Sequence, residues 1–299
     1  MRIFLVVVIL TPKLATAVRI PDVLRLAAFA GDSTSGGNPA GVVIGAEMPD
    51  VPTMQAIAAE VGYSETVFAA LESPSHWRVR YFAPASEVSF CGHATIALGA
   101  ALALEHGDGT FDLRLNDFDI TVEGRRDDAA GLITAALQSP PTSSETASGT
   151  LAHNALALFG LSVEQLDQRI PISVASAGSS HLVIALDAHS DLTAMSYELD
   201  EGKRLMDEHG LTTIALLHAE RNNRFCVRCA FASGGVHEDP ATGSAAAALG
   251  GLLRDLGWPH AGRVEVTQGV DMGMPSKLVV EIGKAVGESV RVSGLVRRI

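Results

Sequence analysis

Residues 87–99 read EVSFCGHATIALG, and residues 238–250 read EDPATGSAAAALG. In both stretches a glutamate is followed five residues later by a glycine, and the glycine opens a run of small and aliphatic residues. These glycines, Gly92 and Gly243, lie 151 residues apart, and a Val-Arg pair precedes each stretch. The alignment predicts an internal duplication, in which each half supplies a strand, an acidic loop and the start of a central helix.

The predicted helices that begin at these glycines, residues 92–105 and 243–256, are apolar on every side. A helix without a polar face has to be enclosed by other elements. Segments that alternate in polarity, such as residues 77–82 and 224–232, predict strands ahead of each helix. We therefore expect both helices to be buried.

The composition is that of a soluble globular protein. Of the 299 residues, 47% are hydrophobic and only 19% are charged, which is enough apolar material for one large or two ordinary domains. The net charge is −12 and aromatic residues make up 5%, so we expect no nucleic acid as a partner. The apolar run at 3–10 is too short to span a bilayer, and we expect no membrane as a partner either. Three cysteines cannot form a disulfide framework, which fits a reducing cytosol.

The domain boundaries are predicted from local composition. Residues 1–23 are expected to be an extension, whose first part, 1–17, imitates a secretory signal ending in Ala-Thr-Ala. We expect a cytoplasmic protein, with export as the alternative if that segment is a genuine signal. The stretch 139–150 is dense in Pro, Ser, Thr and Gly and predicts a linker between a first domain, 24–138, and a second, 151–299.

The duplication predicts a binding site between the two halves. If the halves pack about a pseudo-two-fold axis, the helix starts at Gly92 and Gly243 face each other, and their unpaired N–H groups suit an anionic small molecule. Three side chains that exchange protons are expected near this cleft: Glu65, His93 and Asp239. Two carboxylates and an imidazole can take a proton from one atom and return it to another, as an isomerisation requires.

Several sequence blocks resemble, in order, those of the PhzF-like phenazine biosynthesis isomerase family, which has the diaminopimelate epimerase fold. The blocks are GNPAGVV at 37–43, SETVF at 64–68, YFAP at 81–84, CGHAT at 91–95, GSSHL at 178–182, EDPATGSA at 238–245, QG at 268–269 and GMPS at 273–276. The resemblance implies an α+β fold of two pseudo-symmetric domains, each a mostly antiparallel sheet rolled around a central buried helix. The last strand is expected to be able to return to the first domain.

The resemblance also implies an activity and site residues. The family's acid/base glutamate maps onto Glu65, its histidine onto His93 and its aspartate onto Asp239. Substrate-binding positions map onto the residues Ser64, Gly92, Gly243 and Ser244. The family member that gives it its name moves a proton and a double bond on a dihydro-hydroxyanthranilate without a cofactor, and it is a homodimer. We therefore expect a cofactor-independent isomerase of a small carboxylate-bearing metabolite that pairs with a second copy.

Cys91 leaves a second enzymatic reading open. In the wider epimerase fold, cysteines at both helix starts act as opposed bases, but here Thr242 stands opposite Cys91. A threonine hydroxyl is a poor base, so a symmetric two-thiol racemase is not expected. A helix start is expected to lower the pKa of the Cys91 thiol, and an epimerase or a hydroxy-amino-acid dehydratase that uses Cys91 as its base stays an alternative. A third reading is a non-catalytic protein that binds a small acid.

Metal and nucleotide motifs are absent from the sequence. Cys226 and Cys229 are spaced as a Cys-x-x-Cys pair, but in a strand they would point to opposite faces. No His-Glu-x-x-His, no Gly-x-Gly-x-x-Gly and no phosphate-binding loop occurs. We therefore expect no metal and no cofactor.

Overall fold

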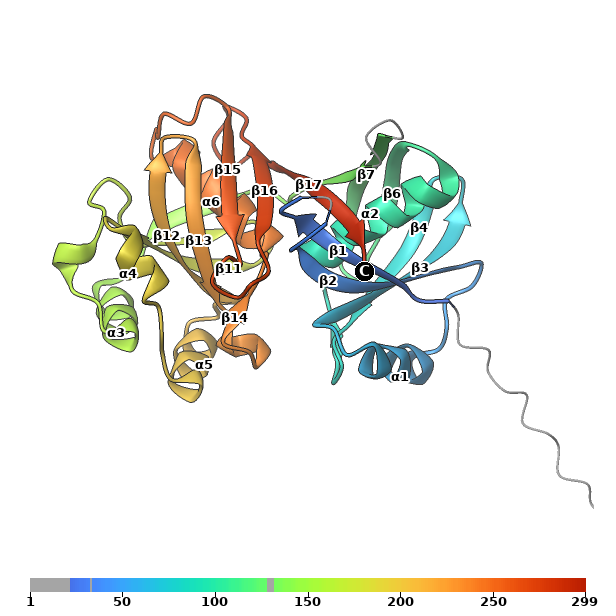
Figure 1. Ribbon diagram of the computed structural model, residues 1–299, viewed down its shortest axis with the longest axis horizontal. Helices are drawn as coiled ribbons and strands as arrows, with labels where there is room; N and C mark the ends of the chain where they lie inside the picture. Colours follow the sequence, from blue (N-terminus) through green and yellow to red (C-terminus); the bar gives the residue numbers. More distant parts are fainter. Residues whose placement is uncertain (1–21, 33, 128–131) are drawn as a thin grey trace, which may run out of the picture.

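The computed structural model describes residues 22–32, 34–127 and 132–299 and shows two halves that lie side by side (Figure 1). Most of the predicted extension, and the signal-like segment 1–17 with it, lies outside the described residues. Within the described residues, no helix is both long and apolar enough to cross a membrane.

The first half is a ring of eight paired strands around one helix, α2 (Gly92–His106). Around the ring the strands are β1 (Leu24–Ala30), β2 (Asn38–Gly45), β3 (Glu65–Ser73), β4 (His76–Phe82), β6 (Gly109–Arg114), β7 (Asp119–Asp127), β8 (Leu132–Gln138) and β17 (Arg291–Arg298). The pairs β2–β3 and β4–β6 are parallel, and the other neighbours are antiparallel. Helix α1 (Val51–Val61) packs outside the ring against β3 and β4.

The second half repeats this order around α6 (Gly243–Asp255). Its strands, in pairing order, are β9 (Ser143–Thr146), β10 (Ser173–Ser176), β11 (Ser180–Leu186), β12 (Thr213–Arg221), β13 (Arg224–Ala230), β15 (Arg263–Gln268) and β16 (Ser276–Glu281). The helices α3 (Gly149–Phe159), α4 (His189–Thr193) and α5 (Leu199–Glu208) belong to this half, as do short 3-10 turns at Val163–Gln165 and Ala232–Gly234. Here β11–β12 and β13–β15 are the parallel pairs.

The strand registers confirm the predicted pseudo-symmetric fold. Thr66 pairs with Phe82 in the first half, and the residues 148 positions later, Ile214 and Ala230, pair in the second. A short strand precedes each central helix, β5 (Glu87–Val88) before α2 and β14 (Glu238–Asp239) before α6. Each is held by a two-contact ion pair from the strand before it, Arg80 to Glu87 and Arg228 to Glu238.

Both central helices are buried as the sequence predicts. Residues 93–103 of α2 are buried without interruption, and so are residues 245–254 of α6. Small residues allow this enclosure, because the wall strands come very close to the helix. A Cβ atom added at Gly124 of β7 would overlap the carbonyl oxygen of Gly99 in α2.

The stretch between the halves is more ordered than its composition suggests. Residues 139–150, expected to be a linker, contain β9, which pairs with β10, and lead into α3. The last strand, β17, pairs with β16 of the second half and with β8 and β1 of the first. We propose that residues 24–138 and 151–299 form the two domains, with β17 joining them.

Candidate active site

The starts of the two central helices meet between the halves. A Cβ atom added at Gly92 would lie 3.6 Å from the backbone nitrogen of Ser244 and 3.7 Å from the Cα of Gly243. The residues before each helix, Cys91 and Thr242, make no side-chain capping hydrogen bond to it. The positive ends of two helix dipoles therefore meet at this place. Because both helices begin with a glycine and have no side-chain cap, a ligand can come close to their backbone N–H groups.

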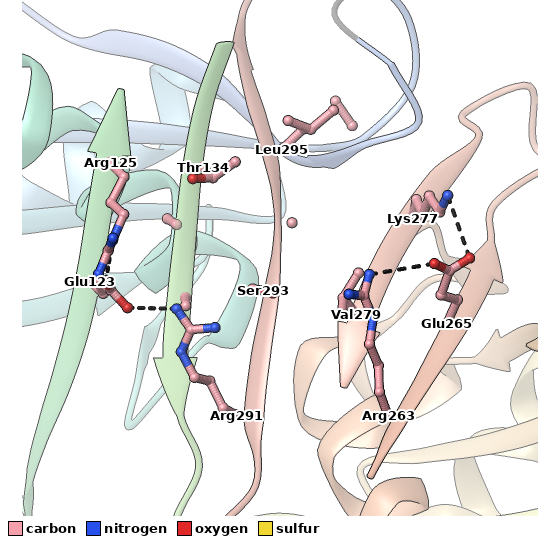
Figure 2. A pocket seen from close by; sticks show the side chains of 14 residues that line it. Glu123, Arg125, Thr134, Arg263, Glu265, Lys277, Val279, Arg291, Ser293 and Leu295 are labelled. Carbon is pink, nitrogen blue, oxygen red and sulfur yellow. Dashed lines mark hydrogen bonds and ion pairs between the residues drawn. The ribbon is translucent and has the colours of Figure 1, made fainter. Parts of the chain in front are cut away.

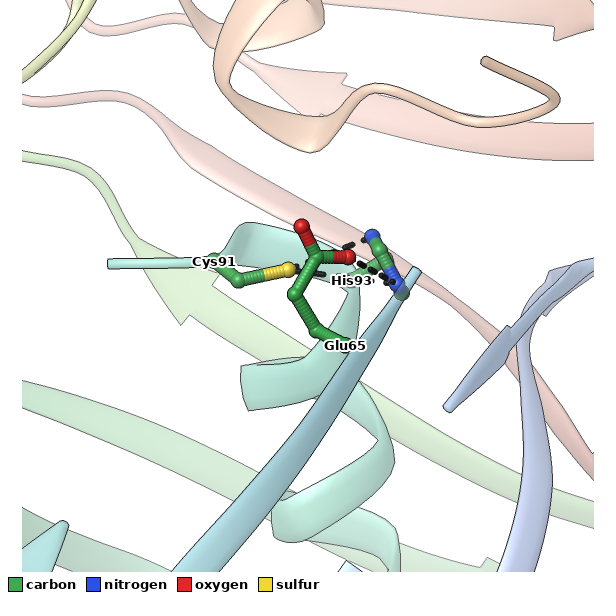
Figure 3. A group of neighbouring side chains, drawn as sticks. All are labelled: Glu65, Cys91 and His93. Carbon is green, nitrogen blue, oxygen red and sulfur yellow. Dashed lines mark hydrogen bonds and ion pairs between the residues drawn. The ribbon is translucent and has the colours of Figure 1, made fainter. Parts of the chain in front are cut away.

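Glu65 and His93 form the centre of the site (Figure 3). Glu65 is the first residue of β3, and His93 is the second residue of α2. The Nε2 atom of His93 lies 3.4 Å from Oε2 of Glu65 and 3.4 Å from the hydroxyl of Ser64. The Glu65 residue is 9% exposed, yet its Oε2 has no hydrogen-bond partner. A buried carboxylate oxygen that accepts no hydrogen bond is costly unless it serves a ligand or a reaction.

Cys91 belongs to the same cluster, but its thiol is less acidic than an ordinary cysteine, whereas the sequence predicted a more acidic one. Its Sγ lies 3.3 Å from Nδ1 of His93. Burial, followed by the charge of Glu65, raises the pKa of the Cys91 thiol well above its usual value, and Asp239 adds to this. The N–H of Ala94 at the helix start favours the thiolate, as predicted, but is outweighed. The expectation of a lowered thiol pKa was therefore wrong.

Asp239 approaches the cluster from β14 of the second half. Its Oδ1 accepts a hydrogen bond from Nδ2 of Asn38 at 2.8 Å, and its Oδ2 accepts one from the Thr242 hydroxyl at 2.5 Å. Burial raises the pKa of Asp239 from 3.8 to about 6, and the charge of Glu65 contributes in the same direction. The charge of His93 and the two hydrogen bonds oppose this rise. A carboxyl group with this pKa can gain or lose a proton near neutral pH.

Two residues of the site were not singled out from the sequence. Asn38 is buried, belongs to the first half, and also donates to the carbonyl of Ala241, so it ties the halves together. Gln268 is buried as well and donates to the Asp239 carbonyl at 2.7 Å and to the Thr242 hydroxyl at 3.1 Å. Both lie in blocks of the family resemblance, GNPAGVV and QG, and that was the only signal for them.

A separate groove lies between the halves and contains none of these residues (Figure 2). It has a volume of about 370 Å³ between β7, β8 and β17 on one wall and β15 and β16 on the other. Its charged groups pair with one another, as Arg291 does with Glu123 and Lys277 with Glu265. The acid/base cluster itself is nearly closed, since the side chains of His93 and Glu65 are 7% and 12% exposed.

The cluster also has the composition of a metal-binding group. One ligand atom each from Glu65, Cys91 and His93 can be chosen so that all three lie within 4.8 Å of one another. The sequence predicted no metal because no spaced motif occurs. Spacing along the chain cannot detect this group, since Glu65 comes from a different element.

Comparisons with known proteins agree on one family. The family model "Phenazine biosynthesis-like protein" (PhzC-PhzF) matches residues 26–296. An "uncharacterized isomerase" of Deinococcus radiodurans is 35% identical over 82% of this chain and 82% of its own length. A trans-2,3-dihydro-3-hydroxyanthranilate isomerase of Pseudomonas aeruginosa is 28% identical over 90% of this chain and 91% of its own.

Solved structures agree with these matches. The structure of a predicted epimerase from Pseudomonas aeruginosa superposes with a TM-score of 0.79 at 26% identity, over 93% of this chain and 96% of that chain. A PhzF family protein from Bacillus anthracis gives a TM-score of 0.80 at 21% identity with the same coverage, which bears on the fold alone.

Proposed function

The chain belongs to the phenazine biosynthesis-like (PhzC-PhzF) family and is an isomerase, and we propose that it moves a proton, and with it a double bond, on a small carboxylate-bearing substrate without a cofactor. Two carboxylates and an imidazole supply the proton acceptors and donors that such a reaction needs. A cytoplasmic location and a homodimeric state stay predictions.

The observation that carries the proposal is the Oε2 atom of Glu65, which accepts no hydrogen bond. This oxygen is buried, has no hydrogen-bond partner, and lies beside His93. A carboxylate held in this way is a positioned general base. In the proposed step Glu65 takes a proton from one substrate carbon, and the electron pair of that C–H bond forms the shifted double bond. The electron pair of the original double bond then takes the proton back from the Glu65 carboxylic acid and forms the new C–H bond at the other carbon.

The helix starts are proposed to hold the substrate carboxylate. Their N–H groups at Gly92 and Gly243 lack capping side chains. Ser244 directly follows Gly243, and the Ser64 hydroxyl lies 3.4 Å from Nε2 of His93, the residue after Gly92. Binding there fixes the reacting carbon relative to Glu65, and the converging dipoles stabilise negative charge that develops on the substrate. Because the cluster is nearly closed, the substrate enters when the two helix starts move apart.

Asp239 is proposed to hold or relay a proton across the cleft. Its pKa of about 6 places both protonation states within reach near neutral pH. Asn38 and Thr242 donate to its two oxygens and fix its orientation. His93 is proposed to orient Glu65 through their 3.4 Å contact.

A thiol base is disfavoured by the same geometry. The pKa of Cys91 is raised well above its usual value, so the thiol stays protonated at neutral pH and is a weak base. Thr242 occupies the equivalent position before α6 and supplies no second base. These two features favour the carboxylate mechanism over an epimerase or dehydratase that works through Cys91.

Solvent exchange tests the proposal. The protein is incubated in deuterated water with trans-2,3-dihydro-3-hydroxyanthranilate, the compound in the names of two relatives, and deuterium at the reacting carbon is measured by mass spectrometry. Glu65→Gln should slow the exchange by at least about 100-fold, because positioned acid/base groups contribute on that order or more. Glu60→Gln, at an exposed position of α1, is the matched control and should leave it unchanged. Exchange by Glu65→Gln at the wild-type rate would rule out Glu65 as the base.

A further inference from the structure

We propose that Gln268 is a positioning residue, which acts on Asp239 through the hydroxyl of Thr242. It keeps that hydroxyl in the role of a donor, so that a proton gained by Asp239 stays available to a ligand. The consequence for catalysis rests on the proposed function, in which Asp239 holds or relays a proton. The hydrogen bonds that carry the inference do not depend on it.

The side chain of Gln268 is buried and uses both ends of its amide. Its Nε2 atom donates to the carbonyl oxygen of Asp239 at 2.7 Å and to the hydroxyl of Thr242 at 3.1 Å. Its Oε1 atom accepts from the backbone N–H of Thr242 at 3.2 Å. A carbonyl oxygen can only accept and a backbone N–H can only donate. These two backbone contacts therefore fix the amide, and the end that faces the Thr242 hydroxyl is a donor.

The hydroxyl of Thr242 then has one good direction for its own proton. Its oxygen accepts from Gln268 and lies 2.5 Å from Oδ2 of Asp239. The buried thiol of Cys229 is also near this hydroxyl, but sulfur is a weak acceptor. Because a carboxylate is the stronger acceptor, Thr242 donates to Asp239.

The other oxygen of Asp239 is held by a fixed donor from the first half. Nδ2 of Asn38 donates to Oδ1 of Asp239 at 2.8 Å and to the carbonyl oxygen of Ala241 at 3.1 Å. The carbonyl can only accept, so the Asn38 amide cannot turn round without losing this contact. A proton that binds to Asp239 therefore has to lie on a lone pair directed at neither Asn38 nor Thr242. Such a proton is available for transfer, as the proposed relay requires.

Fixed donors also stabilise the ionised form of Asp239. The bonds from Thr242 and Asn38 lower the pKa of this carboxyl group and oppose burial, which raises it to about 6. Without the Gln268 amide, the Thr242 hydroxyl is free to turn and to accept a proton from the carboxylic acid instead. The pKa of Asp239 is therefore expected to rise when Gln268 loses its amide.

The charges around Asp239 stay the same in such a variant. The titratable and charged groups on the elements packed against it are Glu65 of β3, Cys91 and His93 at the start of α2, Cys229 of β13, and Glu238 with its partner Arg228. Replacing one neutral amide alters none of these groups. A change in the acidity of Asp239 then reports on its hydrogen bonds.

The test measures the acidity of Asp239 in protein without substrate. Urea unfolding is followed between pH 4 and pH 9 for each variant and for the same variant that also carries Asp239→Asn. The difference between the two gives the pH at which Asp239 ionises in the folded state. Gln268→Met has no amide and should raise this pH by about one unit, as expected when a charged group loses one hydrogen bond. Thr242→Val should also raise it, and Thr242→Ser should leave it in place.

The double variant separates an action through Thr242 from a general loosening of the loop. In protein that already carries Thr242→Val, Gln268→Met should add no further shift. Gln55→Met is the matched control, because it removes a glutamine amide of α1 that donates to the backbone carbonyls of Ala83 and Pro84. It should leave the ionisation of Asp239 unchanged.

Two results would overturn the proposal: an unchanged ionisation pH in Gln268→Met, or a shift of equal size with and without Thr242→Val. If Gln268→Met does not fold, Thr242→Val decides the question, and an unchanged pH in that variant has the same meaning. Wild-type protein that exchanges no deuterium would count against the proposed function and leave these hydrogen bonds standing, so the two failures are distinguishable.

Discussion

Replacing Asp239 by asparagine should remove a pH-dependent loss of stability. The folded protein raises the pKa of this carboxyl group from 3.8 to about 6, chiefly by burial. The folded state therefore holds the proton more tightly than the unfolded state does. The associated stability is fully present below about pH 4 and is lost as the pH rises through about 6.

The size of the effect follows from the gap between the two pKa values. At about 1.4 kcal/mol for each pKa unit, the wild type loses about 3 kcal/mol in free energy of unfolding once Asp239 is ionised. Asparagine stays neutral and avoids this loss. The stability of Asp239→Asn minus that of the wild type should thus increase by about 2 to 3 kcal/mol between pH 4 and pH 8.

Urea unfolding at intervals between pH 4 and pH 8 measures this difference. Other carboxylates titrate in both proteins, so their contributions cancel in the subtraction. Asp117→Asn, at an exposed bend, is the matched control for the loss of a carboxylate. A difference between Asp239→Asn and wild type that stays constant with pH would refute the account of a buried, proton-holding carboxyl group.

Three further predictions concern the scaffold and the cleft. Gly124→Ala should cost at least about 3 kcal/mol in urea unfolding because its Cβ overlaps the α2 backbone, while Gly149→Ala, with open space around it, should change stability by less than about 1 kcal/mol. Arg228→Met should lower the free energy of unfolding by about 3 kcal/mol, because it leaves its partner Glu238 buried without a cation. Arg80→Met should lower it by only about 1 kcal/mol, because the equivalent pair with Glu87 is more exposed. Equal losses in the two variants would contradict this reasoning. Gly92→Ala should fold normally, since its Cβ meets only ordinary contacts, but raise KM about tenfold or more by crowding the substrate carboxylate; an unchanged KM would argue against binding there.

The architecture was predictable because two of its signals are strong in the sequence. A helix that is apolar on every side has to be buried. A sequence block that repeats 151 residues later predicts that the two halves each contain such a helix in the same structural position. Cys91 and His93 were identified because they stand in one of these repeated blocks, and Glu65 because it lies in the SETVF block of the family resemblance. The strand at 143–146 was hidden because its serines and threonines read as a linker, although it gains its hydrogen bonds from β10.

The electrostatics of the site was less predictable. Asn38 meets Asp239 across 201 positions of sequence, and no local pattern reports such a contact. The pKa of Cys91 was predicted in the wrong direction because the helix-start rule considers one element alone. Glu65 from β3 and Asp239 from β14 bring negative charge to the thiol, and together with burial they outweigh the helix.

Equivalent positions of the two halves carry different chemical groups. In the first half Glu65 pairs with Ala40, and in the second half the corresponding pair is Thr213 with His181. The Thr213 hydroxyl lies 2.8 Å from Nδ1 of His181, and burial lowers the pKa of this histidine to about 3. The second half therefore has a neutral, hydrogen-bonded pair where the first half has a carboxylate oxygen that faces His93 and accepts no hydrogen bond.

The short strands before the central helices, β5 and β14, also differ, and here it is the second half that carries the carboxylate. Asp239 pairs with Cys229 in the second half, and the residue in the matching register of the first half is Val88, which pairs with Tyr81. Each half thus brings one carboxylate to the cleft, but from non-equivalent positions and with different hydrogen bonding. A racemase needs matched bases on two faces of one carbon, whereas a proton shift between two atoms is served by one free base and one carboxyl group that is held in place. This asymmetry within a symmetric scaffold is the structural reason to favour a proton shift over a racemisation.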